Sequence, residues 1–184
     1  MSVVPLVEAR QAPLLAQPAF ANGDPGPIAA SLAHVPELLE VALPFIGAVL
    51  GPSSIDARTK EIVILRTSAR ADCRYCVETH TVVALDEGLS PDEVRALRDE
   101  APCSKTFAAP REAALIAWVD AIAGTVGPVD SSLATSLTEH FEDHEVVELT
   151  LVVATTLMLN RYCTALQLPT SAATLARLAG EGMA

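Results

Sequence analysis

The chain has 184 residues, of which 51% are hydrophobic and only 4% are aromatic, and its formal net charge is −11 at pH 7. This length favours one domain with a substantial core, and the scarcity of aromatic residues means that Ala, Leu, Val and Ile must build that core. The acidic balance argues against binding to nucleic acid or to an anionic membrane surface, because both need clustered Lys and Arg.

The N-terminal sequence lacks a basic start followed by a continuous apolar stretch, so we expect no signal peptide. No segment reaches roughly 18 uninterrupted apolar residues, and we therefore expect no transmembrane helix. Four cysteines in a chain of this length do not resemble the disulfide framework of a small secreted protein. These observations predict a soluble, cytoplasmic protein.

Residues 1–27 contain five prolines and are predicted to form an irregular arm, whereas residues 28–184 are predicted to form one helical domain. Apolar residues of the arm, such as Leu6 and Phe20, indicate that it lies on a surface, which could belong to a neighbouring subunit. The apolar spacing and the Pro and Gly positions then predict a series of helices. Their approximate ranges are 27–33, 34–46, 55–71, 73–87, 90–98, 110–124, 133–141 and 145–168.

Capping residues support several of these boundaries. Ser53 or Ser54 can cap the helix that follows, and Asp72 is placed to cap the helix that begins at Cys73. Gly88 is a suitable residue to end that helix. The segment Ser90-Pro91-Asp92-Glu93 has the spacing of a capping box with proline in the first turn.

The segment Cys73-Arg74-Tyr75-Cys76-Val77-Glu78-Thr79-His80 contains the residues best suited to chemistry. Two thiols at i and i+3 share one face of a helix, and a histidine four residues after the second thiol falls on the same face. The helix N-terminus and the basic Arg74 would raise the thiolate fraction, and the thiolate attacks peroxide or disulfide sulfur. A second thiol one turn away can condense with the resulting sulfenic acid. The spacing therefore indicates redox chemistry.

Zinc binding and haem attachment are two other roles that cysteine and histidine can have. Two thiolates, an imidazole and a carboxylate could bind zinc, but structural zinc sites normally have a second, distant pair of ligands, which this chain lacks. Val77 follows the second cysteine where c-type haem attachment requires histidine, so haem is excluded. No metal or cofactor is predicted. Cys103 is expected to be unpaired, and His140 and His144 to be solvated. His34 is expected to have a local capping or packing role.

A weak internal repeat links the two halves of the chain. When Glu61 is aligned with Glu148, Cys73-Arg74-Tyr75-Cys76 falls on Asn160-Arg161-Tyr162-Cys163, with four identities in sixteen positions. The second copy would have lost the first thiol and the histidine. Chemistry would then lie only in the first copy, with Glu148 and Cys163 left in packing roles.

Glu61, twelve positions before Cys73, together with Cys73-x-x-Cys76-x-x-x-His80 and the Gly88-Leu89-Ser90 turn, resembles the alkylhydroperoxidase D-like branch of the carboxymuconolactone decarboxylase superfamily. The resemblance runs from about His34 to Leu168. It implies an all-α fold with duplicated helical units, assembled as a homo-oligomer. It also implies a cysteine-based peroxidase that uses a small-molecule hydroperoxide and a lipoyl or thioredoxin-like dithiol reductant.

The resemblance further implies the roles of the site residues. Cys76 would be the peroxidatic cysteine and Cys73 the resolving one, while Glu61 and His80 would form the proton relay. The residues support this independently, since His80 lies one turn from Cys76 and a carboxylate can orient and charge-stabilise its imidazole. One departure is Tyr75, which stands where well-studied members have histidine between the cysteines. A redox switch or thiol-disulfide oxidoreductase, and a carboxymuconolactone decarboxylase-type enzyme, are the alternatives.

Overall fold

The computed structural model describes residues 2–124 and 127–184, so Met1 of the predicted arm lies outside the described residues. All regular elements in the described part of the chain are helices, and none of its residues lies in a strand. The all-α fold predicted from the sequence is thus confirmed.

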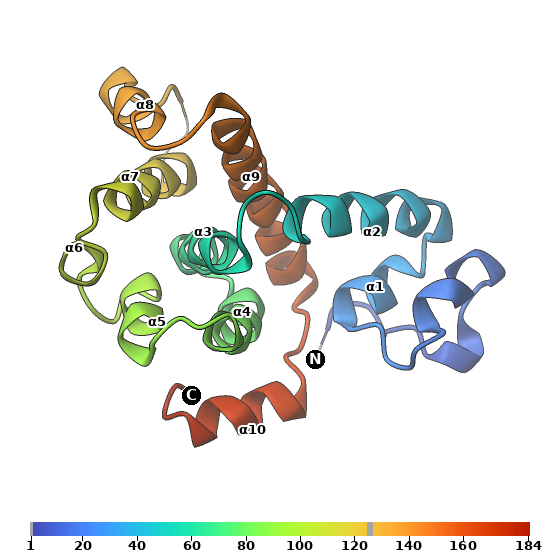
Figure 1. The fold of residues 1–184 in the computed structure, drawn as a ribbon. Coiled ribbons are helices and arrows are strands. Elements are labelled where there is room, and N and C mark those ends of the chain that lie inside the picture. Colours follow the sequence, from blue (N-terminus) through green and yellow to red (C-terminus); the bar gives the residue numbers. More distant parts are fainter. Residues whose placement is uncertain (1, 125–126) are drawn as a thin grey trace.

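Helix α3, Ala57–Arg70, is the centre of the molecule (Figure 1). It packs against α4 (Arg74–Asp86), α9 (Asp143–Leu166), α7 (Pro110–Gly124) and α5 (Pro91–Leu97). Nine consecutive residues of α3, Lys60 to Ser68, are buried on all sides of the helix. A helix buried all round is normally apolar, so its charged residues need partners within the protein.

The other helices surround this core. Helix α2 extends away from it toward α1 and the N-terminal segment, and α10 crosses below α4 (Figure 1). Their bounds are Pro27–Leu32 for α1, Pro36–Leu50 for α2, Cys103–Thr106 for α6, Ser131–Thr138 for α8 and Ala172–Gly180 for α10.

Several predicted boundaries need correction. Helix α3 is capped by Asp56, whose side chain accepts a hydrogen bond from the Thr59 amide, and not by Ser53 or Ser54. Asp72 does not cap α4, because it takes a left-handed backbone conformation with φ of 52° and the N-cap residue is Cys73. This bend turns the chain sharply between α3 and α4 and lets the two helices pack side by side.

Other local predictions are confirmed. Ser90 and Glu93 form the reciprocal hydrogen bonds of a capping box. Gly88, with φ of 87°, ends α4, and the Leu89 amide then bonds back to the Ala84 carbonyl. The helix predicted over 110–124 has the observed bounds Pro110–Gly124.

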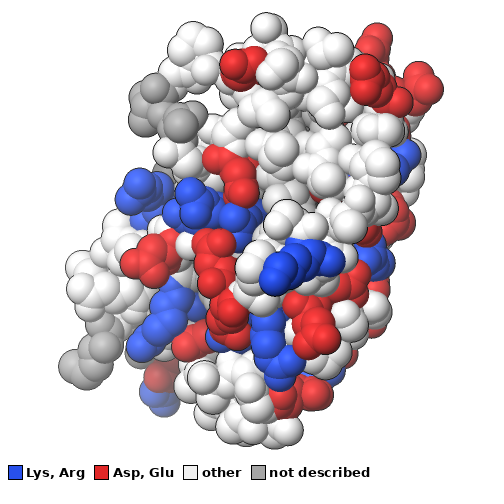
Figure 2. Space-filling model, turned by 90° about the vertical axis from the view of Figure 1, so that its left-hand side faces the viewer, with Lys and Arg blue, Asp and Glu red and all other residues white. Residues whose placement is uncertain are grey.

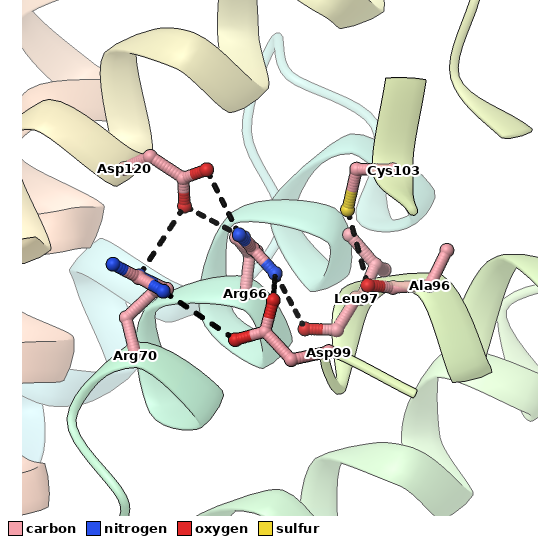
Figure 3. A network of polar contacts seen from close by, with 7 residues as sticks. All are labelled: Arg66, Arg70, Ala96, Leu97, Asp99, Cys103 and Asp120. Carbon is pink, nitrogen blue, oxygen red and sulfur yellow. Dashed lines mark hydrogen bonds and ion pairs between the residues drawn. The ribbon is translucent and has the colours of Figure 1, made fainter. Parts of the chain in front are cut away.

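The buried Arg66 connects α3 to two neighbouring segments (Figure 3). Its guanidinium donates to both carboxylate oxygens of Asp120 in α7, at 2.6 and 2.9 Å, and also to Asp99 after α5. Arg70 lies one turn later and pairs with the same two carboxylates. Acidic and basic side chains likewise lie next to one another over the lower half of the face in Figure 2. Paired charges therefore help to hold the outer helices on α3.

The N-terminal arm packs on its own chain. It contains two 3-10 helices, Ala9–Gln11 and Leu14–Phe20, and the second of these forms a small apolar cluster with α1 and the start of α2. The Val3 amide donates to the Leu166 carbonyl at the end of α9, and the ring of His34 bonds to the Pro5 carbonyl. His34 thus has the local packing role expected for it.

Helix α9 is long and apolar enough to cross a membrane by length and composition alone. It packs against α2, α3, α4 and α7 as a core helix of the bundle. The segments aligned in the internal repeat differ locally, because Glu148 and Asn160 share this one helix whereas the chain bends between Glu61 and Cys73.

Candidate redox site

The two cysteines of the motif meet at the start of α4. Cys73 is the N-cap residue and Cys76 lies in the first turn, and their sulfurs form a disulfide across a Cα–Cα distance of 5.3 Å. Both residues are buried. A thiol in the first turn of a helix faces the positive end of the helix dipole, which favours its ionised form.

Glu61 and His80 lie together on the facing sides of α3 and α4. Nδ1 of His80 is 2.9 Å from Oε2 of Glu61, whose side chain is buried while that of His80 is about one quarter exposed. When Nδ1–H donates to this carboxylate, Nε2 is left as the basic nitrogen of the ring. The structure therefore brings together the two residues that the sequence placed nineteen positions apart.

A cavity of about 60 Å³ lies next to the Cys76–His80 segment of α4. Cys76 and His80 both line it, as does Tyr75 from the same helix. Thr79 of α4 also lines it, and the remaining lining comes from four other helices and consists of Ile28, Leu50, Ile64, Ser68, Thr156, Leu159 and Asn160. A thiol, a base and a small enclosed space thus share one location.

A larger hollow of about 290 Å³ lies on the other side of the motif. Cys73 and Arg74 line it together with the C-terminal end of α9. Tyr75 lines both spaces. Burial raises the pKa of its phenol, so the side chain that both spaces share is uncharged. A second molecule can therefore approach the Cys73 side without passing through the small cavity.

Arg74 does not lie where its charge would act on the thiols, which is where the sequence predicted it. Its guanidinium is largely exposed and lies 3.8 Å from Glu78, its partner one turn later. The positive influence on the thiols must then come mainly from the helix N-terminus. The described residues contain no group of three or more His, Cys, Asp or Glu side chains arranged to hold a metal ion.

Sequence reasoning missed the role of α9 at this site. Asn160 and Thr156 line the cavity, although the repeat pointed only to Asn160 as the position of a lost thiol. Cys163 packs in one apolar cluster with Cys73 and Cys76, and burial raises the pKa of its thiol to about 12. Cys103 forms no disulfide, and its thiol donates to the Ala96 carbonyl (Figure 3).

The chain is similar to known proteins both in sequence and in fold. Residues 36–121, which include Glu61, both cysteines and His80, match the carboxymuconolactone decarboxylase family. An uncharacterized peroxidase-related protein from Ralstonia eutropha with an alkylhydroperoxidase AhpD core superposes with a TM-score of 0.78 at 18% identity, covering 94% of each chain. The chain resembles the alkylhydroperoxidase D-like branch of the carboxymuconolactone decarboxylase superfamily.

Two further structures show the range of proteins that share this AhpD-like fold. A protein from Agrobacterium tumefaciens, described as a candidate AhpD antioxidant defence protein, has 23% identity and a TM-score of 0.68, covering 77% of this chain and 95% of its own. The debrominase Bmp8, crystallised with 2,3,4-tribromopyrrole, has 18% identity and a TM-score of 0.75, covering 98% of this chain and 99% of its own. No functionally curated protein matches the sequence.

Proposed function

We propose that the protein is a thiol-dependent peroxidase that reduces small-molecule hydroperoxides through Cys76 and Cys73. The observation that carries the proposal is the shared cavity, which is lined by Cys76 and by His80, the partner of Glu61. Peroxidase-related and antioxidant proteins among the AhpD-like structures support the same chemistry.

The reaction begins with the reduced pair. His80 takes the proton of the Cys76 thiol, and the charge of Glu61 stabilises the resulting imidazolium. The thiolate attacks the terminal oxygen of the hydroperoxide, the O–O bond breaks, and His80 returns the proton to the departing alkoxide. The products are an alcohol and a sulfenic acid on Cys76.

The second half restores the thiols. The Cys73 thiol attacks the sulfur of the sulfenic acid, which forms the disulfide and releases water. An external dithiol then reduces this disulfide by exchange, and its own thiols are oxidised. We propose that a lipoyl group or a thioredoxin-like protein is this donor and that it approaches through the 290 Å³ hollow beside Cys73.

Steady-state peroxide consumption with dihydrolipoamide as donor tests the proposal. We expect turnover by the wild type, none by Cys76→Ser, and a stop after one equivalent of peroxide in Cys73→Ser. His80→Ala should lower the rate by about 10²-fold or more, the usual contribution of a general base. Wild-type turnover in Cys76→Ser would refute the assignment. Reversible disulfide formation without turnover would instead favour a redox switch.

We also propose a homo-oligomer. Helices α2 and α9 pack together and expose large apolar side chains, namely Leu38, Val41, Phe45, Val147, Leu151 and Met158. A second copy could cover this face and remove these side chains from water. Light scattering coupled to size exclusion should show an assembly that dissociates in Val41→Glu. A reducing compartment such as the cytoplasm would keep the thiols available for reaction.

A further inference from the structure

Two residues that line the cavity beside Cys76 each have a buried oxygen with no hydrogen-bond partner among the described residues. These are Oδ1 of Asn160, in a residue that is 1% exposed, and Oγ1 of Thr156, in a residue that is 3% exposed. Buried polar groups are nearly always paired, because an unpaired one loses its hydration without compensation. Two such oxygens on residues that line one cavity point to a polar molecule as the missing partner.

The amide of Asn160 has a defined orientation. Its Nδ2 donates to Oγ of Ser68 in α3 at 3.1 Å. Because the two polar atoms of an amide project in different directions from one carbon, this bond turns Oδ1 away from Ser68. Oδ1 is an acceptor only, so its partner must carry an O–H or N–H donor.

The size and the walls of the cavity restrict the partner further. A volume of about 60 Å³ holds only a small group, since one water already needs roughly 10–15 Å³ of such space. The side chains of Ile28, Leu50, Ile64 and Leu159 provide apolar walls. The ligand is therefore small and has its polar end near α9 and Cys76.

We infer that Asn160 and Thr156 bind the hydroperoxide group itself, and that the preferred substrates are hydrogen peroxide and short-chain alkyl hydroperoxides. Oδ1 of Asn160 accepts the hydrogen bond from the terminal O–H, and the Thr156 hydroxyl donates to the second oxygen. This inference rests on the proposed peroxidase function and specifies its substrate class.

These contacts match the movement of charge in the reaction. The Cys76 thiolate attacks the terminal oxygen, whose hydrogen stays on the sulfenic acid and remains bonded to Asn160. Negative charge develops on the second oxygen as the O–O bond breaks, and the Thr156 hydroxyl stabilises it until His80 supplies the proton. A donor aimed at developing charge is worth more in the transition state than in the ground state.

Single-turnover stopped-flow oxidation of the reduced protein by hydrogen peroxide tests the inference. Asn160→Ala and Thr156→Val should each slow the oxidation of Cys76 by about 10-fold or more. Thr155→Val is the matched control, because Thr155 is a buried threonine of the same helix that does not line the cavity. It should react at the wild-type rate. Thr156→Val keeps the shape of the side chain, so it reports on the hydroxyl even if Asn160→Ala disturbs the fold.

Alkylation of the same reduced variants by iodoacetamide separates binding of peroxide from activation of the thiol. We expect alkylation of Cys76 to stay within 2-fold of wild type, because iodoacetamide does not carry the hydroperoxide group. If the variants lost as much rate in alkylation as in oxidation, the inference would be wrong. It would also be wrong if both variants were oxidised at the wild-type rate, because the cavity would then hold water only. A wild-type protein that peroxide oxidises no faster than free cysteine would refute the proposed function and this inference with it.

Discussion

Nδ1 of His80 lies 2.9 Å from Oε2 of Glu61, and this pair joins the buried central helix to the helix that carries both redox cysteines. Glu61 is buried by the packing of α3, whereas His80 reaches the cavity beside Cys76. A carboxylate fixed on one side of the ring determines which nitrogen faces the reaction and stabilises the ring when it gains a proton.

Replacing Glu61 with Gln should therefore lower the rate of Cys76 oxidation by roughly 10²-fold, because Gln retains a hydrogen bond to His80 but not the negative charge. The measurement is stopped-flow oxidation of the reduced protein by hydrogen peroxide. Glu87→Gln is the matched control, since this exposed residue at the end of α4 removes the same charge from the chain. An equal rate in Glu61→Gln and wild type would contradict a role for the carboxylate in proton transfer.

The buried Cys163 should be unreactive although it packs in the same cluster as the redox pair. Burial raises the pKa of its thiol to about 12, so only about one molecule in 10⁴ carries the thiolate at pH 8. In reduced native protein at pH 8, iodoacetamide should label Cys76 at least about 100-fold faster than Cys163, as measured by peptide mass spectrometry. Labelling in urea is the control, because unfolding should expose Cys163 and remove the difference.

The residues of the site differ in how far the sequence could predict them. Cys73, Cys76 and His80 share one helix, so their spacing alone predicts their proximity, and Glu61 followed from the family motif. Asn160 could not be found in this way. It lies on α9, and the packing of α9 on α3 and α4 depends on contacts across the whole core.

The N-terminus of α4 shows a second limit of sequence reasoning. Asp72 is a favourable capping residue by type, yet the chain uses it for the left-handed bend between α3 and α4. The bend is required because α3 and α4 pack side by side. The packing of the two helices therefore decides the conformation of Asp72, and the preference of Asp for the N-cap position does not.

The ion pair between Lys60 and Glu148 should contribute strongly to stability. Nζ of Lys60 lies 2.8 Å from Oε1 of Glu148 and also donates to the carbonyls of Val49 and Gly51, and the Lys60 side chain is only 3% exposed. Glu148→Gln would leave this buried charge without its counter-ion, at a cost on the order of 2–3 kcal/mol in urea unfolding. The double variant Lys60→Met/Glu148→Leu should recover most of this loss, because it removes both charges. No recovery would show that the pair is not the cause.

The ion pair between Lys60 and Glu148 should also make the free energy of unfolding depend on pH in the acidic range. Hydrogen bonds from Lys60 and Ser53 hold the pKa of Glu148 below its usual range. A lowered folded-state pKa contributes stability that is fully present above the unfolded-state pKa of about 4.3 and is lost as the pH falls through the folded value. The free energy of unfolding should therefore decrease below about pH 4 less steeply in Glu148→Gln than in wild type. Parallel curves for the two proteins would contradict this contribution.

The small cavity predicts selectivity by size, and Leu159 offers the means to change it. This half-buried residue of α9 forms part of the apolar lining of the cavity, so Leu159→Ala should enlarge the space near Cys76. The ratio of kcat/KM for cumene hydroperoxide to that for hydrogen peroxide should rise by about 10-fold, the effect expected when a close apolar contact no longer excludes a larger group. Leu157→Ala is the matched control, because Leu157 lies on the same helix and packs on the main core, outside the cavity lining. It should lower stability by a comparable amount, about 2 kcal/mol, without changing the ratio. An equal change of the ratio in both variants would mean that general loosening of α9, and not the cavity wall, sets the selectivity.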